Sequence, residues 1–135
     1  MFALAIVFNG DVSKWDTARV IWIYQMFGEA KVFNGDLSKW DTAKFEDMTE
    51  MFLQAEAFNR DVSEWDTARV ESMRHMFFDA SKFYQNLSKW DTARVDRNGD
   101  CTAFATGSSC PIDADPTNRN QGFQTCEARF EECSI

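Results

Sequence analysis

The chain has 135 residues, of which 44% are hydrophobic, and a formal net charge of −8 at pH 7. This length suits one domain with a continuous core, and the acidic balance argues against nucleic acid as a partner, because phosphate binding needs clustered Lys and Arg. No apolar run approaches the roughly 18 residues that cross a bilayer, so no transmembrane segment is predicted.

Residues 1–95 repeat with a fixed period of 25, and residues one period apart are called a column here. Two aromatic columns define the repeat: Phe8, Phe33, Phe58 and Phe83, and Trp15, Trp40, Trp65 and Trp90. A fixed period of this length predicts stacked supersecondary units. Met1 and Phe8 fall on the columns of Met26 and Phe33, so the chain opens in mid-repeat. From this we expect a fragment, an incomplete subunit or a protein docked end-on to another.

Residues 33–57 form a typical unit. Asn34–Gly35–Asp36 is turn chemistry, and the short alternating run Leu37–Trp40 predicts one parallel strand. Asp41 or Thr42 would cap a helix, whose apolar stripe comprises Phe45, Met48, Phe52 and Ala55. The repeats therefore predict a right-handed α/β solenoid of about four coils, with one short parallel strand and one helix per coil.

Polar columns indicate further contacts between coils. Asn9, Asn34 and Asn59 would form a hydrogen-bonded ladder along the turns. The Asp column (Asp16, Asp41, Asp66 and Asp91) places like charges in a row. A basic column lies three residues further on, and this i, i+3 spacing predicts that it offsets the Asp column.

One helical face departs from the repeat. Ile21, Trp22 and Tyr24 stand where the next unit has Glu46, Asp47 and Thr49. Large apolar side chains on an otherwise charged surface usually mark a contact, so these three residues are predicted to bind a protein partner. The alternative is that the C-terminal tail or an N-terminal segment covers them.

Residues 96–135 form a separate cap or tail that contains all four cysteines: Cys101, Cys110, Cys126 and Cys133. Their spacing matches no zinc motif, and an even count in an aperiodic segment favours two disulfides with three possible connectivities. Disulfides favour an extracellular, cell-surface or lumenal location. The alternative is four free thiols in the cytosol.

Other candidate sites are weak. Asn86–Leu87–Ser88 is a glycosylation pattern, but a position within a strand favours unmodified Asn86. Asp96–Asp100 resembles the start of a calcium loop, yet Cys101 and Gly107 stand where an EF-hand needs Gly and Glu. His75 is the only histidine, so no His-pair metal site and no nucleophile–base pair is expected. The sequence therefore predicts no enzyme, cofactor or metal.

The motif Phe–Asn–x–Asp–Leu–Ser–x–Trp–Asp–Thr, followed by Met–x–x–Met–Phe–x–x–Ala, resembles the BspA-like repeats, relatives of leucine-rich repeats. The resemblance covers residues 1 to about 95. It implies a leucine-rich-repeat-like solenoid, a role in surface recognition or adhesion, and no catalytic residues. Disulfide caps on extracellular leucine-rich repeats offer an analogy for a disulfide-bonded C-terminal cap on residues 96–135.

The expected function is a non-enzymatic interaction scaffold, a surface recognition module or an accessory subunit of a larger assembly. The alternative is binding to an ordered polymer or solid, such as glycan or ice, through a regular row of threonines: Thr17, Thr42, Thr67 and Thr92. The partner and the cysteine connectivity cannot be read from the sequence.

Overall fold

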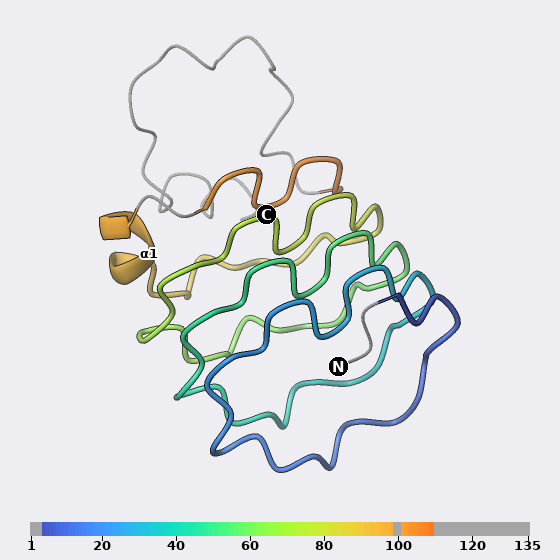
Figure 1. The fold of residues 1–135 in the computed structure, drawn as a ribbon, viewed down its shortest axis with the longest axis horizontal. Coiled ribbons are helices and arrows are strands. Elements are labelled where there is room, and N and C mark those ends of the chain that lie inside the picture. The colour runs from blue at the N-terminus through green and yellow to red at the C-terminus, as the bar shows by residue number, and fades with distance from the viewer. Residues whose placement is uncertain (1–3, 99–100, 110–135) are drawn as a thin grey trace, which may run out of the picture.

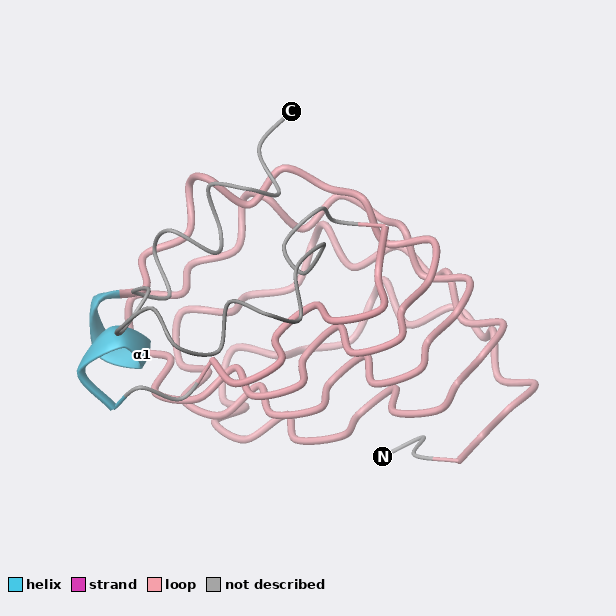
Figure 2. Ribbon diagram, turned by 90° about the horizontal axis from the view of Figure 1, so that it is seen from above, coloured by secondary structure: helices cyan, strands magenta, loops and turns pink. Residues whose placement is uncertain are grey.

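The computed structural model describes residues 4–98 and 101–109. The chain winds into stacked coils that follow one another from blue to orange in Figure 1. Viewed from above, successive coils have similar outlines, each displaced from the one before it (Figure 2). Each coil has a tryptophan half, such as 33–45, and a turn half, such as 46–57.

Regular secondary structure is almost absent from the described residues. They contain one helix, α1 (Ala93–Asn98), and no strand. Two isolated parallel bridges, Trp22 to Asp47 and Asp47 to Ser72, link three successive coils. The prediction of one strand and one helix in each coil is therefore wrong.

The turn half is not helical because its backbone N–H groups alternate between two kinds of acceptor. The N–H groups of Ile23, Gln25 and Phe27 donate to carbonyl groups of the next coil, at 3.1, 3.0 and 2.9 Å. Those of Met26 and Gly28 donate three residues back within their own coil, both at 3.2 Å. A helix would direct all of them to the residue four positions back. The chain therefore forms consecutive turns.

Backbone dihedrals give the second reason. Two columns have positive φ: Gln25, Glu50 and His75 at 50–56°, and Glu29, Gln54 and Asp79 at 53–58°. Type II turns require positive φ at their third residue, whereas an α-helix needs negative φ throughout. The apolar residues that suggested a helical stripe are therefore carried by turns, which bring them to the same interior.

The predicted strand is also a turn. The N–H of Trp40 donates to the carbonyl of Leu37 at 3.1 Å, which closes a four-residue turn over this segment. Just before it, the Asp36 carboxylate accepts the N–H of Ser38 at 2.9 Å. Asp and Asn readily bond the backbone two residues ahead, and this local bond competes with strand pairing.

The core consists of the repeated apolar columns, which the sequence correctly predicted to be buried. Phe52, Met51 and Met76 are fully buried, and Trp40 and Trp65 are each 5% exposed. The rings of Trp40 and Trp65 are nearly parallel, with centroids 6.5 Å apart. Phe52 and Phe58 stack within one coil at 3.9 Å. The interior is thus built from aromatic stacks that run along the coils.

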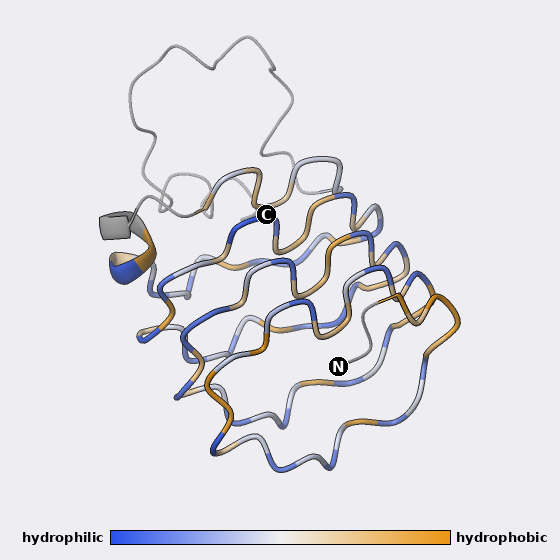
Figure 3. Cartoon of the chain, in the orientation of Figure 1, coloured by the Kyte–Doolittle hydropathy of each residue, from blue (hydrophilic) through white to orange (hydrophobic). Residues whose placement is uncertain are grey.

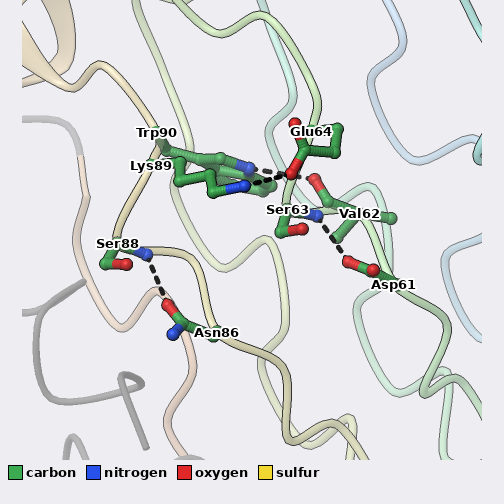
Figure 4. Close-up of polar contacts among 8 residues, drawn as sticks. All are labelled: Asp61, Val62, Ser63, Glu64, Asn86, Ser88, Lys89 and Trp90. Atoms are coloured by element: carbon green, nitrogen blue, oxygen red, sulfur yellow. Dashed lines mark hydrogen bonds and ion pairs between the residues drawn. The ribbon is translucent and has the colours of Figure 1, made fainter.

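Side chains also join successive coils through hydrogen bonds. The indole N–H of Trp90 donates to the Val62 carbonyl at 3.0 Å, and Lys89 pairs with Glu64 (Figure 4). Asn34 Oδ1 accepts the N–H of Asn59 at 3.1 Å, and Asn9 accepts that of Asn34 at 3.0 Å. The predicted asparagine ladder is present, with side-chain oxygens accepting from backbone N–H groups.

Residues 101–109 continue the stack. The N–H groups of His75, Phe77 and Asp79 donate to the carbonyls of Thr102, Phe104 and Thr106. Ala103 and Gly107 have positive φ, as do the two columns of the preceding turn halves. The boundary predicted at residues 95/96 stays a prediction, although the hydrogen-bond pattern extends past it.

The predicted disulfide-bonded cap is not shown. Cys101 is buried and is not a free thiol, but the described residues hold no pair of cysteines at disulfide distance. The other three cysteines, Cys110, Cys126 and Cys133, lie outside the described residues.

Candidate functional site

The apolar patch is defined as Ile21, Trp22 and Tyr24, the residues singled out in the sequence. Their exposed fractions are 38%, 74% and 45%. They lie at the start of the turn half of the first complete coil, on either side of Ile23, which is 2% exposed. Their side chains therefore face outward from a backbone that is anchored in the core, although that backbone is not helical.

The residues equivalent to the apolar patch in the next two coils are polar. The bridge between Trp22 and Asp47 places Trp22 beside the equivalent residue of the next coil. In that coil and the one after it, the same columns hold polar side chains, and the hydroxyl oxygens of Thr49 and Ser72 lie 2.7 Å apart. The patch thus carries three large apolar side chains on columns where the next two coils carry polar ones.

A second group of exposed apolar residues lies just before the first complete coil. Leu4, Ile6 and Val7 are 66%, 52% and 85% exposed. This segment, dark blue in Figure 1, is coloured hydrophobic at the right-hand corner in Figure 3. These three residues were not predicted as a site from the sequence, although they differ in polarity along their columns much as Trp22 does. Leu4 stands on the column of Glu29, Gln54 and Asp79.

The basic column pairs with acidic residues other than the predicted ones. Arg69 pairs with Glu46 at 3.3 Å and Arg94 with Glu71 at 3.4 Å, each with a glutamate of the preceding coil. The Asp column instead accepts backbone N–H groups, as Asp41 does from Ala43 at 3.1 Å. The basic column therefore offsets the glutamates and not the aspartates.

The threonine row does not form a surface. Thr17, Thr42 and Thr67 are 2–4% exposed, and their hydroxyl groups donate to backbone carbonyls of the next coil at 3.0–3.1 Å. These threonines join coils in the interior. They therefore offer no array to a glycan or to ice.

The polar groups considered for chemistry are dispersed. His75 Nδ1 lies 3.7 Å from Glu50 Oε1, and Glu50 also accepts a hydrogen bond from Gln25. No group of three or more His, Cys, Asp or Glu residues that could hold a metal occurs within residues 4–98 and 101–109. Asn86 lies in a turn, where its Oδ1 accepts the N–H of Ser88. In the calcium-like segment, 96–98 end α1 and 99–100 lie outside the described residues.

Comparison with known proteins identifies the family of this chain. The family described as Mycoplasma protein of unknown function, DUF285, matches residues 1–113. This chain belongs to the DUF285 family. The match spans the stacked coils of the DUF285 chain together with the described residues 101–109. The family description does not confirm the resemblance to BspA-like repeats. No match was found among curated proteins or among solved structures.

In the described part of the chain, no helix has both the length and the apolar character needed to cross a bilayer.

Proposed function

We propose that this protein is a non-enzymatic interaction module that binds a protein partner through the apolar patch of Ile21, Trp22 and Tyr24. One observation carries the proposal: Trp22 is 74% exposed between two further exposed apolar side chains, on columns that are polar in the following coils. Burying such side chains against a partner is worth about 1.5–3 kcal/mol each.

The stacked architecture suits this role. The patch backbone is held by hydrogen bonds from Ile23 and Gln25 to the next coil, so its side chains are presented without large loss of backbone entropy on binding. Aromatic residues with one polar end, such as Trp and Tyr, are common in the energetic centres of interfaces.

A surface role in recognition or adhesion, or as a subunit of a larger assembly, is part of this proposal. The resemblance to BspA-like repeats supports an extracellular, cell-surface or lumenal location. The alternative was that the threonine row binds an ordered polymer. This row is buried, so it does not support that alternative.

The test compares the wild type with a variant carrying Ile21→Glu, Trp22→Asp and Tyr24→Thr, which restores the polarity of the next coil. Each protein is immobilised, a partner is captured from a native extract and identified by mass spectrometry, and its affinity is then measured by titration. We expect binding to weaken at least about tenfold, which corresponds to roughly 1.4 kcal/mol. The melting temperature should change little.

Val32→Thr is the matched control, because Val32 is exposed at 44% but lies outside the patch. This variant should retain the partner. If the triple variant binds normally while its melting temperature falls sharply, the patch is covered within the protein and the proposal is wrong.

A further inference from the structure

The fourth coil departs from the repeat at three consecutive positions, where Tyr84–Gln85–Asn86 replaces Asn34–Gly35–Asp36 of the second coil. The change from Asp to Asn creates Asn86–Leu87–Ser88, the one N-x-S/T pattern in the sequence. This pattern is the acceptor for N-linked glycans, which attach to surface loops of secreted proteins. The described residues contain no strand, so the reason for expecting unmodified Asn86 no longer holds.

The Asn86 side chain presents its amide nitrogen to solvent. Asn86 is exposed, and its backbone is anchored by Phe83 and Leu87, which are both fully buried. Its Oδ1 accepts the N–H of Ser88 at 2.9 Å. Because an N–H bonds only to an acceptor, this contact turns the oxygen toward Ser88 and the nitrogen away from the residues labelled in Figure 4. In the described part of the chain, no hydrogen bond uses Asn86 Nδ2.

The hydroxyl of Ser88 is also available. In the first coil the equivalent Ser13 hydroxyl donates to the Asp11 carboxylate at 2.6 Å, and the hydroxyls of Ser38 and Ser63 bond their aspartates in the same way. Ser88 is exposed, and among the described residues no hydrogen bond uses its hydroxyl. The glycosylation pattern requires a hydroxyl at its third position. Both residues that define the pattern are therefore exposed.

Tyr84 adds an exposed aromatic ring next to this pattern. It is 42% exposed, on a column that holds asparagine in the three preceding coils. Tyr84 precedes Asn86 by two residues, so their Cα atoms lie at most about 7 Å apart. The C–H face of a sugar ring is apolar, and packing it on an aromatic face removes both surfaces from water. The first sugar of a glycan on Asn86 is thus within reach of Tyr84.

We propose that Asn86 carries an N-linked glycan whose first sugar packs against Tyr84. In the transfer, Asn86 Nδ2 forms a bond to the anomeric carbon of an oligosaccharide carried on a lipid diphosphate. The bond from that carbon to the diphosphate oxygen breaks, the lipid diphosphate leaves with the electron pair, and Nδ2 loses one proton. The proposal rests on the location given under the proposed function, because N-linked glycans are found on secreted proteins.

The direct test uses the protein purified from its native source. Trypsin releases residues 83–89 as one peptide, because Lys82 and Lys89 flank the cleavage sites. Peptide N-glycosidase removes an N-linked glycan and converts its asparagine to aspartate, which mass spectrometry detects. We expect the peptide to carry a glycan before treatment and an aspartate in place of Asn86 after it. A peptide that is unmodified before treatment would overturn the proposal.

A second experiment separates the site from the location. The 135-residue chain is secreted from a eukaryotic cell line, and its mass is compared with those of the Asn86→Gln and Ser88→Ala variants. Peptide N-glycosidase should lower the mass of the wild type alone. Ser88→Ala is the matched control, because it keeps Asn86 and the backbone N–H that Asn86 bonds. A secreted wild type without a glycan would overturn the site. A glycan that is present on the secreted chain but absent from the native protein would overturn the location.

Melting temperatures test the contact with Tyr84. Each glycosylated protein is compared with the same chain from cells treated with tunicamycin, which blocks synthesis of the lipid-linked donor. The glycan should raise the melting temperature of the wild type and of Tyr84→Phe by at least about 2 °C more than that of Tyr84→Asn. Equal increases in all three proteins would show that the sugar does not pack against Tyr84.

The glycan proposal and the proposed function can fail separately. Asn86 lies in the tryptophan half of its coil, whereas the apolar patch lies in a turn half. Asn86→Gln should therefore keep the protein partner, and the triple variant of the apolar patch should keep the glycan. A chain that binds its partner through the patch but carries no glycan would overturn only the glycan proposal. A glycosylated chain whose triple variant binds the partner normally would overturn only the proposed function.

Discussion

At the scale of single residues, short polar side chains organise the turns. Asp11, Asp36 and Asp61 each accept the backbone N–H of the serine two residues ahead, at 2.9–3.0 Å. For Asp36 and Asp61, these backbone bonds and the serine hydroxyls lower the pKa of the carboxyl group below 3.8. For Asp11 the Ser13 hydroxyl is the larger cause of the lowered pKa. In the fourth coil Asn86 makes the same backbone bond without a charge (Figure 4).

These aspartates predict a specific acid sensitivity. Because the pKa of each of these carboxyl groups is lower in the folded state, its ionised form stabilises the fold fully above the unfolded-state pKa near 3.8. This stabilisation is lost as the pH falls through the lower pKa of the folded state. A variant with Asp11→Asn, Asp36→Asn and Asp61→Asn keeps the acceptors but does not titrate. Its melting temperature should fall less than that of the wild type between about pH 5 and pH 3.

Asn86→Asp is the reverse experiment at the equivalent position. It adds a fourth titrating acceptor and should make the melting temperature more sensitive to acid. Identical pH profiles for the wild type and both variants would show that these hydrogen bonds do not couple protonation to folding.

At the scale of the structural element, the period was more informative than local propensity. It correctly predicted which columns are buried, because burial depends on the position of a residue in the coil and not on its backbone conformation. Phe45, Met48 and Phe52 are buried at helical spacing, but the same spacing is satisfied by successive turns. The residues with positive φ, such as Glu50 and Gln54, are not glycines, so the sequence carries little local signal against a helix.

For the candidate site, too, the period predicted which residues stand out but not the backbone contacts around them. Comparing columns identified Ile21, Trp22 and Tyr24 because it detects polarity changes between equivalent positions. The hydrogen bonds that hold the backbone beside these residues, from the N–H groups of Ile23 and Gln25, were not predicted from the sequence, because they run between the turns of successive coils. An expected helix would have satisfied most of its carbonyl groups internally.

Gln54 offers a direct test of turn against helix. Its φ of 53° suits glycine and disfavours β-branched residues. We therefore expect Gln54→Gly to keep or slightly raise stability, and Gln54→Val to lower it by about 1–3 kcal/mol. A helix would give the opposite order, because glycine costs about 1 kcal/mol relative to alanine and valine costs less. Urea unfolding of the two variants distinguishes the two outcomes.

At the scale of the whole molecule, stability depends on position along the stack. In a stack of repeats each coil contacts mainly its neighbours, so the cost of removing a side chain depends on how much of it those neighbours bury. Trp65 stacks on Trp40 and on Trp90, with centroids 6.5 and 6.2 Å apart, and its indole N–H donates to the Leu37 carbonyl. Trp15 stacks on Trp40 but remains 42% exposed.

The same substitution should therefore have unequal costs along the tryptophan column. Trp65→Ala removes a side chain that is 5% exposed, and we expect it to lower the free energy of unfolding by about 3–5 kcal/mol. Trp15→Ala removes a half-exposed ring and should cost at least about 1 kcal/mol less, since the lost burial is smaller. Denaturant unfolding followed by circular dichroism measures both values. Equal losses would contradict this neighbour-by-neighbour account, and would mean that the first coil is buried as fully as the third.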